Sequence, residues 1–279
     1  MKMGSGVFII LSAILHAAWN TFAKRNSTPY YEVLGIMSFA TVFSLVFIPF
    51  FSGPLFKTSD SFLWALTSGL FEGGYIITLA ISLSQSSLGK AYIIMRGSAM
   101  VIVWFISACF LGENINLSNV IGVSSVLFGL ILTSKTFNPV QSRQLLFPVL
   151  CGICIAGYHL CYGRSLAYGA NPAALFSAAL WIALPCVYLL MNKEQKQVFK
   201  DQIKSNWKIT SLGGIISALS FLLFLIGLRH SEAGLALTLR NTSVVFAQIF
   251  AYFIGEKISQ YQWIGAFLVA LGASLIYPY

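Results

Sequence analysis

The chain has 279 residues, of which 57% are hydrophobic and only 9% are charged, whereas about 25% of residues are charged in a typical soluble domain. The apolar residues form continuous runs rather than alternating with polar ones, which excludes a soluble globular protein and favours membrane helices over a barrel. The net charge of +9 does not indicate a nucleic-acid partner, because the basic residues are scattered through short connections between these runs.

Ten apolar runs are each long enough to cross the bilayer as a helix. The first has no basic cluster before it beyond Lys2 and no convincing small-residue cleavage site, so we interpret it as a retained span. The predicted fold class is therefore all-α, a polytopic membrane protein of ten transmembrane helices in the bacterial inner (plasma) membrane. The expected spans are residues 5–23, 31–51, 62–84, 88–111, 115–133, 146–168, 172–191, 208–229, 233–255 and 259–277.

Basic residues gather on one side of the predicted bilayer. Connections after odd-numbered spans hold eleven of them, and the opposite side holds four. Because positive charge resists translocation, this bias predicts that the loop at residues 192–208 is cytoplasmic and that both termini lie outside. Within that loop, Val198 and Ile203 stand between lysines, which is compatible with a solvated connection or with a short amphipathic helix on an anionic leaflet. The eleven are Lys24, Arg25, Lys90, Lys135, Arg143, Lys193, Lys196, Lys200, Lys204, Lys208 and Lys257, and the four are Lys2, Lys57, Arg164 and Arg229.

An internal repeat with an offset of 143 residues divides the chain into two copies, residues 1–138 and 139–279. Each copy contains five spans, an odd number, so the second copy must enter the membrane from the opposite side. The sequence thus predicts two inverted five-helix repeats, an arrangement that permits alternating access to a central site. The matched pairs are Ala13/Ala156, His16/His159, Pro29/Pro172, Trp64/Trp207, Thr67/Thr210, Gly112/Gly255, Glu113/Glu256, Ile115/Ile258, Gly122/Gly265 and Gly129/Gly272.

The two-repeat plan, the stretch His16-Ala-Ala-Trp-Asn20 and the Gly-Glu ends of spans four and nine resemble the EamA type of the drug/metabolite transporter superfamily. The resemblance covers essentially the whole chain. It implies that spans one to four and six to nine surround a central cavity, that spans five and ten are peripheral, and that small polar or amphipathic metabolites are moved, commonly outward. It also implies cytoplasmic termini, against the lysine bias. Span one lacks the essential glutamate of the four-span multidrug members, which argues against proton-coupled export of bulky cations.

Three charged residues lie well inside spans, away from the span ends. Glu72 is the one acid of eight near the middle of a span, and its neighbours Gly73 and Gly74 let a backbone or a ligand approach. It is either a proton carrier or anchor for an amino group, or a structural partner of Arg96. Arg96 and Arg240 each need a carboxylate, carbonyl dipoles or a ligand anion, unless Arg240 snorkels to an interface. Because one acid cannot neutralise both arginines, the surplus charge favours a substrate with a carboxylate or phosphate.

His16 and His159 occupy matching positions near the centres of spans one and six, and each is flanked by polar or aromatic residues at helical spacing. Facing inward, these stripes would line a solute path; alternatively each histidine is only an interhelical hydrogen-bonding group. We expect Glu72 and His16 to couple a proton. The predicted substrate-binding residues are His16, Trp19, Asn20, Glu72, Tyr75, Arg96, His159, Tyr162, Trp181 and Arg240, with Tyr92, Asn241 and Gln248 as secondary contacts.

These features predict a secondary transporter of amino acids or related carboxylate-bearing solutes, an exporter or an exchanger, with a proton-coupled exporter of organic cations or drugs as the alternative. An enzyme is disfavoured, because no metalloprotease, paired-aspartate or Ser/His motif lies in the spans. No cofactor or metal is expected, since Cys151 and Cys154 lack a second ligand pair. The expected partners are the solute and the lipid bilayer but not nucleic acid, and a homodimer is compatible with the sequence. Glu113 and Glu256, each after a glycine at a span end, are expected to cap or pair across the connections.

Overall fold

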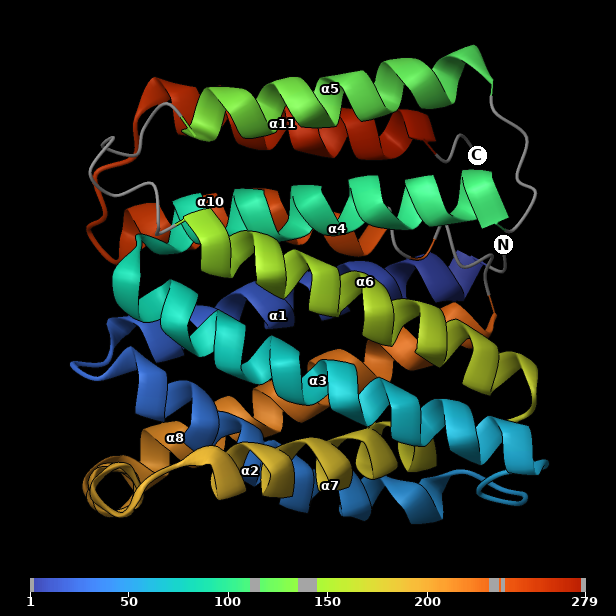
Figure 1. Cartoon of the computed structure of the whole chain (residues 1–279), viewed down its shortest axis with the longest axis vertical. Helices are drawn as coiled ribbons and strands as arrows, with labels where there is room; N and C mark the ends of the chain where they lie inside the picture. Colours follow the sequence, from blue (N-terminus) through green and yellow to red (C-terminus); the bar gives the residue numbers. More distant parts are fainter. Residues whose placement is uncertain (1–2, 111–115, 135–144, 231–235, 237–238, 277–279) are drawn as a thin grey trace.

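A computed structural model describes residues 3–110, 116–134, 145–230, 236 and 239–276. Over these residues the chain forms ten α-helices and no strand, so the all-α prediction is confirmed (Figure 1). The helices are α1 (Met3–Arg25), α2 (Pro29–Phe47), α3 (Ser59–Gln85), α4 (Leu88–Phe110), α5 (Leu117–Ser134), α6 (Leu146–Ala167), α7 (Pro172–Leu190), α8 (Lys193–Arg229), α10 (Ser243–Phe253) and α11 (Gln260–Ile276).

Local sequence signals set where several helices begin. Pro29 and Pro172, matched by the repeat, stand in the first turns of α2 and α7, where a missing backbone N–H costs nothing. The Asn171 side chain caps α7 by accepting from the N–H groups of Ala173 and Ala174. Helices α2 and α7 therefore start at positions that the repeat relates, because each has a proline in its first turn.

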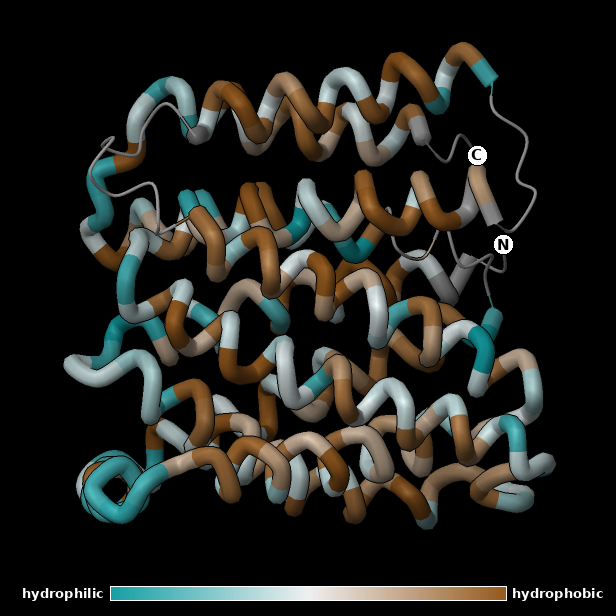
Figure 2. Tube along the Cα trace, viewed as in Figure 1, coloured by the Kyte–Doolittle hydropathy of each residue, from teal (hydrophilic) through white to brown (hydrophobic). Residues whose placement is uncertain are grey.

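Seven of the described helices are long and apolar enough to cross a membrane, namely α1 to α4 and α6 to α8. Brown apolar residues cover most of the bundle in Figure 2, and many large apolar side chains are exposed on its outside, as in a protein that faces lipid. The shorter helices α5, α10 and α11 bring the described α-helices to ten, with one in each of the apolar runs.

Helix α8 differs from the predicted span 208–229, because it begins fifteen residues earlier, at Lys193. The Asn192 side chain and the Gln195 side chain form a reciprocal capping box there. At Asn206 the backbone leaves helical geometry, with φ −120° and ψ 16°, and the helix kinks. In Figure 1 the part of α8 before the kink is seen end-on, so it lies across the direction of the other helices, at the ends of the bundle. The lysine-rich loop is thus a helix.

The two repeats are inverted, and the contacts between their helices come in pairs that the repeat relates. In Figure 1, α1 and α6 run in opposite directions, and both termini lie on the side away from the start of α8. The repeat pairs α1 with α6, α2 with α7, α3 with α8 and α4 with α10. The contacts of α8 with α1 and α2 correspond to those of α3 with α6 and α7. The contact of α1 with α10 corresponds to that of α6 with α4. Each contact recurs when the repeats are exchanged, as a pseudo-two-fold axis in the membrane plane requires.

Helices α5 and α11 form a separate pair at one edge of the bundle (Figure 1). Gly129 faces the backbone oxygen of Gly265, and Gly272 faces that of Gly122. The repeat relates these two contacts, because its offset turns Gly122 into Gly265 and Gly129 into Gly272. Small residues that let two membrane helices approach closely therefore hold the pair, and spans five and ten are peripheral.

We expect Gly129→Ala to lower the unfolding temperature, because the added Cβ would lie 2.9 Å from the Gly265 oxygen and force the helices apart, at a cost of about 1–3 kcal/mol. The matched control is Gly163→Ala in α6, where a Cβ meets nothing within 4 Å and helix propensity improves by up to about 1 kcal/mol. Thermal unfolding in detergent measures both; equal effects of the two changes would show that the glycine contact does not hold the pair.

Candidate solute-binding site

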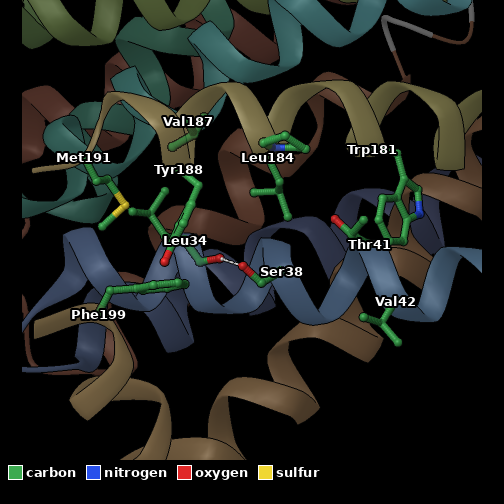
Figure 3. A pocket seen from close by; sticks show the side chains of 11 residues that line it. Leu34, Ser38, Thr41, Val42, Trp181, Leu184, Val187, Tyr188, Met191 and Phe199 are labelled. Atoms are coloured by element: carbon green, nitrogen blue, oxygen red, sulfur yellow. Dashed lines mark hydrogen bonds between the residues drawn. The ribbon is translucent and has the colours of Figure 1, made fainter. Parts of the chain in front are cut away.

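The polar residues predicted from the spans gather inside the bundle, with one exception. Nine of the ten candidates are at most 7% exposed, whereas Trp181 is 49% exposed. Figure 3 shows Trp181 on α7 beside Thr41 of α2, where it lines a groove on the outside of the bundle instead of the interior. The buried nine are His16, Trp19, Asn20, Glu72, Tyr75, Arg96, His159, Tyr162 and Arg240.

Arg240 is held in the interior by groups of α1 and α8. Its Nη1 donates to Ser12 Oγ at 2.7 Å, and its Nη2 lies 3.2 Å from Nδ1 of His16. The guanidinium carbon lies 4.1 Å from the ring centroid of Phe224 and 4.9 Å from that of Phe221. Arg240 is fully buried and does not reach an interface. Its charge is stabilised by hydrogen bonds and aromatic faces.

The contacts of His16 define its tautomer. Its Nδ1 lies 3.3 Å from the indole nitrogen of Trp19 as well as beside Arg240, and both of these groups can only donate. Nδ1 therefore carries the lone pair, and the ring proton resides on Nε2. The backbone oxygen of His16 accepts from Asn20 Nδ2 at 2.8 Å and from the Tyr92 hydroxyl at 3.1 Å. His16 thus joins α1, α4 and Arg240 in one network.

Glu72 on α3 is fully buried and accepts a short hydrogen bond from the Tyr162 hydroxyl of α6. Its second oxygen, Oε2, has no hydrogen-bond partner among the described residues. The proposed ion pair with Arg96 is not formed within the described chain, where the carboxylate bonds Tyr162 instead. Gly73 and Gly74 admit close neighbours from α7 and α6, so the glycines serve helix packing. One carboxylate oxygen remains free to accept.

Arg96 lies among tyrosines. Its guanidinium carbon is 6.0 Å from the Tyr92 ring centroid, and Tyr75 and Tyr158 are within electrostatic range of its charge. The terminal nitrogens of Arg96 and the hydroxyls of Tyr75 and Tyr158 are buried and have no hydrogen-bond partner in the described part of the chain. The two tyrosine rings are 5.4 Å apart, centroid to centroid. These unpaired donors form a buried cluster that lacks an acceptor.

His159, the repeat partner of His16, has a different environment. Its ring stacks on Phe224 at 5.0 Å between centroids and meets Tyr158 edge-on at 4.5 Å. Among the described residues, neither ring nitrogen of His159 has a hydrogen-bond partner. The two histidines occupy equivalent positions, yet one is engaged by an arginine and the other is not.

Four residues of this interior were missing from the predicted site: Ser12, Tyr158, Phe221 and Phe224. Ser12 lies one helical turn before His16, and Tyr158 lies one helical turn before Tyr162, so a search along the faces of these two candidates could have found both. The two phenylalanines gave no such signal, because the chain has 23 of them and most serve packing.

The other charged or polar candidates have structural surroundings. Glu256 accepts from the backbone N–H groups of Leu88 at 2.8 Å and Gly89 at 3.4 Å, and so caps the start of α4 across the repeats. Glu113 lies outside the described residues. Gln248 donates to the Gly89 oxygen at 2.8 Å, which ties α10 to α4.

Arg164 and Asn241 differ in exposure. Arg164 is exposed at the end of α6 and lines a lateral apolar pocket of about 460 Å³ between α3, α4 and α6. Asn241, next to Arg240, is buried, and its amide has no partner among the described residues. Between the helical residues 239–241 and α10, Thr242 keeps α-region angles of φ −56° and ψ −18°, but its N–H bonds the Leu239 oxygen three residues back. The arginine and asparagine therefore stand directly before a tightened turn of span nine.

Comparison with protein families accounts for this architecture. The model of the EamA-like transporter family matches twice, over residues 4–135 and again over residues 143–277. The chain belongs to the EamA-like transporter family. As an EamA-like transporter it is an integral, multi-pass membrane protein.

One solved structure shares the fold of this EamA-like protein along nearly its whole length. It is described only as "Crystal structure of protein" and matches with a TM-score of 0.67 and 19% identity, covering 99% of this chain and 98% of that chain. No match is found among the curated proteins.

Proposed function

We propose that this EamA-like protein is a secondary transporter of small carboxylate-bearing metabolites, amino acids among them, and that it works by alternating access. The observation that carries the proposal is the cluster of buried donors around Arg96 that have no partner in the described part of the chain. An unsatisfied buried polar group costs about 1–3 kcal/mol, and a charged one costs more. A carboxylate bound between Arg96, Tyr75 and Tyr158 would accept from all three and remove this cost.

An amino group on the same solute would find an acceptor nearby. Oε2 of Glu72 is buried and has no donor among the described residues, whereas Oε1 accepts from Tyr162. A zwitterion would therefore complement the interior at both ends, with its carboxylate on Arg96 and its ammonium on Glu72. When the solute has no amino group, a proton on Glu72 would neutralise the carboxylate in its place. His16 would receive or release a proton as Arg240 moves.

Three features support alternating access. The contacts between helices recur when the two repeats are exchanged, and the hydrogen bonds of span nine tighten to i→i−3 at Thr242, two residues after Arg240. The third is the unequal environment of the paired histidines, because Arg240 engages His16 while neither ring nitrogen of His159 has a partner among the described residues. We propose that the opposite state reverses this inequality, and that the direction of transport is outward or by exchange across a bacterial inner membrane, with the lysine-rich end of α8 in the cytoplasm.

A second candidate, export of organic cations, has one observation in its favour. Phe221 and Phe224 already carry the guanidinium of Arg240 on their faces, and such rings bind other cations as well. Two buried arginines against one central acid would repel a cationic solute, so we rank this function second.

The test is a ligand screen by thermal unfolding of the purified protein. Amino acids and dicarboxylates are compared with nucleotides, sugar phosphates and quaternary ammonium compounds. A carboxylate ligand at a hundred times its Kd is expected to add about 2.7 kcal/mol of stability, which raises the unfolding temperature by roughly 5–10 °C. Stabilisation by quaternary cations alone would reject the carboxylate proposal and favour the second candidate.

A further inference from the structure

The first part of α8 is an amphipathic helix that carries a strong positive charge. Between Lys193 and the kink at Asn206 it holds four lysines against two acids, Glu194 and Asp201. Figure 2 shows this end-on helix mainly in teal at the edge of an otherwise brown bundle. Its Phe199 is only partly exposed, because it packs toward the transmembrane helices. The helix therefore lies where a membrane surface meets the bundle, with lysines available to that surface.

Beside this helix, a groove of about 380 Å³ opens between α2 and α7. Figure 3 shows the two helices side by side with the lining side chains between them, and Phe199 closing one end. Helices α2 and α7 are exchanged by the repeat, so the groove lies on the seam between the two halves. Its lining residues are Leu34, Ser38, Thr41, Val42, Trp181, Leu184, Pro185, Val187, Tyr188, Met191 and Phe199.

The lining is mostly apolar, although it includes the three hydroxyl side chains of Ser38, Thr41 and Tyr188. Ser38 donates to the Leu34 backbone oxygen at 2.8 Å, and Thr41 donates to the Met37 oxygen at the same distance, so both hydroxyls are satisfied within α2. Trp181 and Val42, 49% and 58% exposed, open the groove to the outside of the bundle. Beside the polar tips of Tyr188 and Trp181, the lining presents hydrocarbon surface from Leu, Val, Pro, Met and Phe side chains, which accommodates a hydrocarbon chain better than a polar solute.

The length of the groove matches one leaflet. From Leu34 to Val42 the lining extends over eight residue steps of α2, which is about 12 Å at 1.5 Å per residue. Half of the bilayer hydrocarbon core is about 15 Å thick. One end of the groove lies at the end of the bundle, because Met191 caps the end of α7 and Phe199 belongs to the first part of α8. One acyl chain, entering from the membrane surface, would fill it.

A cation stands at the mouth of the groove. Nζ of Lys196 lies 4.6 Å from the ring centroid of Tyr188, which lines the groove, so the ammonium is placed directly over its wall. Lys193 and Lys200, each within one helical turn of Lys196, are exposed beside it. An apolar slot for a chain thus ends under a group of lysines, the arrangement that a negatively charged headgroup requires.

We propose that the groove between α2 and α7 binds one anionic phospholipid, with an acyl chain between Leu34 and Val42 and the phosphate against Lys196 and its neighbouring lysines. A second copy of the chain is a poorer occupant, because a two-fold contact through this face would bring the lysines of both copies together. The proposal is independent of the solute that the central site carries.

The test is native mass spectrometry of the detergent-purified protein with phosphatidylglycerol or phosphatidylcholine of identical acyl chains added. We expect one retained phosphatidylglycerol and weak retention of phosphatidylcholine. Lys196→Ala should weaken retention of phosphatidylglycerol about five-fold, as expected for one lysine near an anionic headgroup. Lys57→Ala, an exposed lysine at the opposite end of the bundle, is the charge control and should change nothing.

A second pair of variants tests the slot itself. Val42→Phe would fill the groove and prevent retention, whereas Val46→Phe, on the same helix and similarly exposed at 56%, does not line the groove and should leave retention intact. Equal retention of the two lipids, no response to Lys196→Ala and Val42→Phe, or a dimer without lipid would each overturn the proposal. If a variant fails to fold, the comparison of the two lipids on the wild-type protein still decides between these outcomes.

Discussion

Glu72→Gln is expected to reduce concentrative uptake in proteoliposomes to the level of empty vesicles, while the protein folds normally. Glutamine has the same shape and can still accept from the Tyr162 hydroxyl, so the contact between α3 and α6 persists. It cannot bind a proton, and it lacks the charged Oε2 that would pair with an ammonium group and that has no partner among the described residues. Uptake of radiolabelled solute under an imposed pH gradient measures the effect, and thermal unfolding checks the fold.

The matched control for Glu72→Gln is Glu194→Gln, which changes an exposed carboxylate at the start of α8 and should transport at the wild-type rate. Tyr162→Phe removes the hydroxyl but keeps the carboxylate, so it should retain uptake with an altered pH profile. If Glu72→Gln took up solute normally at every imposed gradient, Glu72 would be only a partner for Tyr162.

Arg96→Ala is expected to weaken binding of carboxylated solutes roughly 10- to 150-fold, because a hydrogen bond to a charged group contributes about 1.5–3 kcal/mol. The unfolding temperature should change little, since the terminal nitrogens of Arg96 make no hydrogen bond within the described chain. Arg240→Ala should lower the unfolding temperature as well, because it breaks the bonds to Ser12 and His16. Isothermal titration with the ligands found by the screen separates affinity from stability.

The exposed Arg164 provides the control for Arg96, since Arg164→Ala removes the same charge outside the buried cluster. It should leave the affinity for carboxylates unchanged. If Arg96→Ala weakened binding of quaternary cations more than binding of carboxylates, the central site would be a cation site.

The sequence alone was sufficient to predict the all-α fold and the division of the chain into two inverted repeats. A helix in lipid satisfies its own backbone, so the length and apolarity of each run predict a span without knowledge of its neighbours. The start of α8 was missed by fifteen residues because hydropathy does not detect an amphipathic helix outside the hydrocarbon core. A local signal was present, since Asn192 and Gln195 have the spacing of a capping box.

Only the tertiary structure decided which polar groups meet. In a span that is apolar all round, the pattern of residues does not reveal which face is buried, so Trp181 could not be told from the buried candidates. Because the sequence does not define how each helix is rotated about its axis, it could not predict that Glu72 pairs with Tyr162 instead of Arg96. For the same reason it could not predict that Ser12 and His16 are the partners of Arg240. Composition determines that such costly groups need partners, and the packing of the helices determines which partners they find.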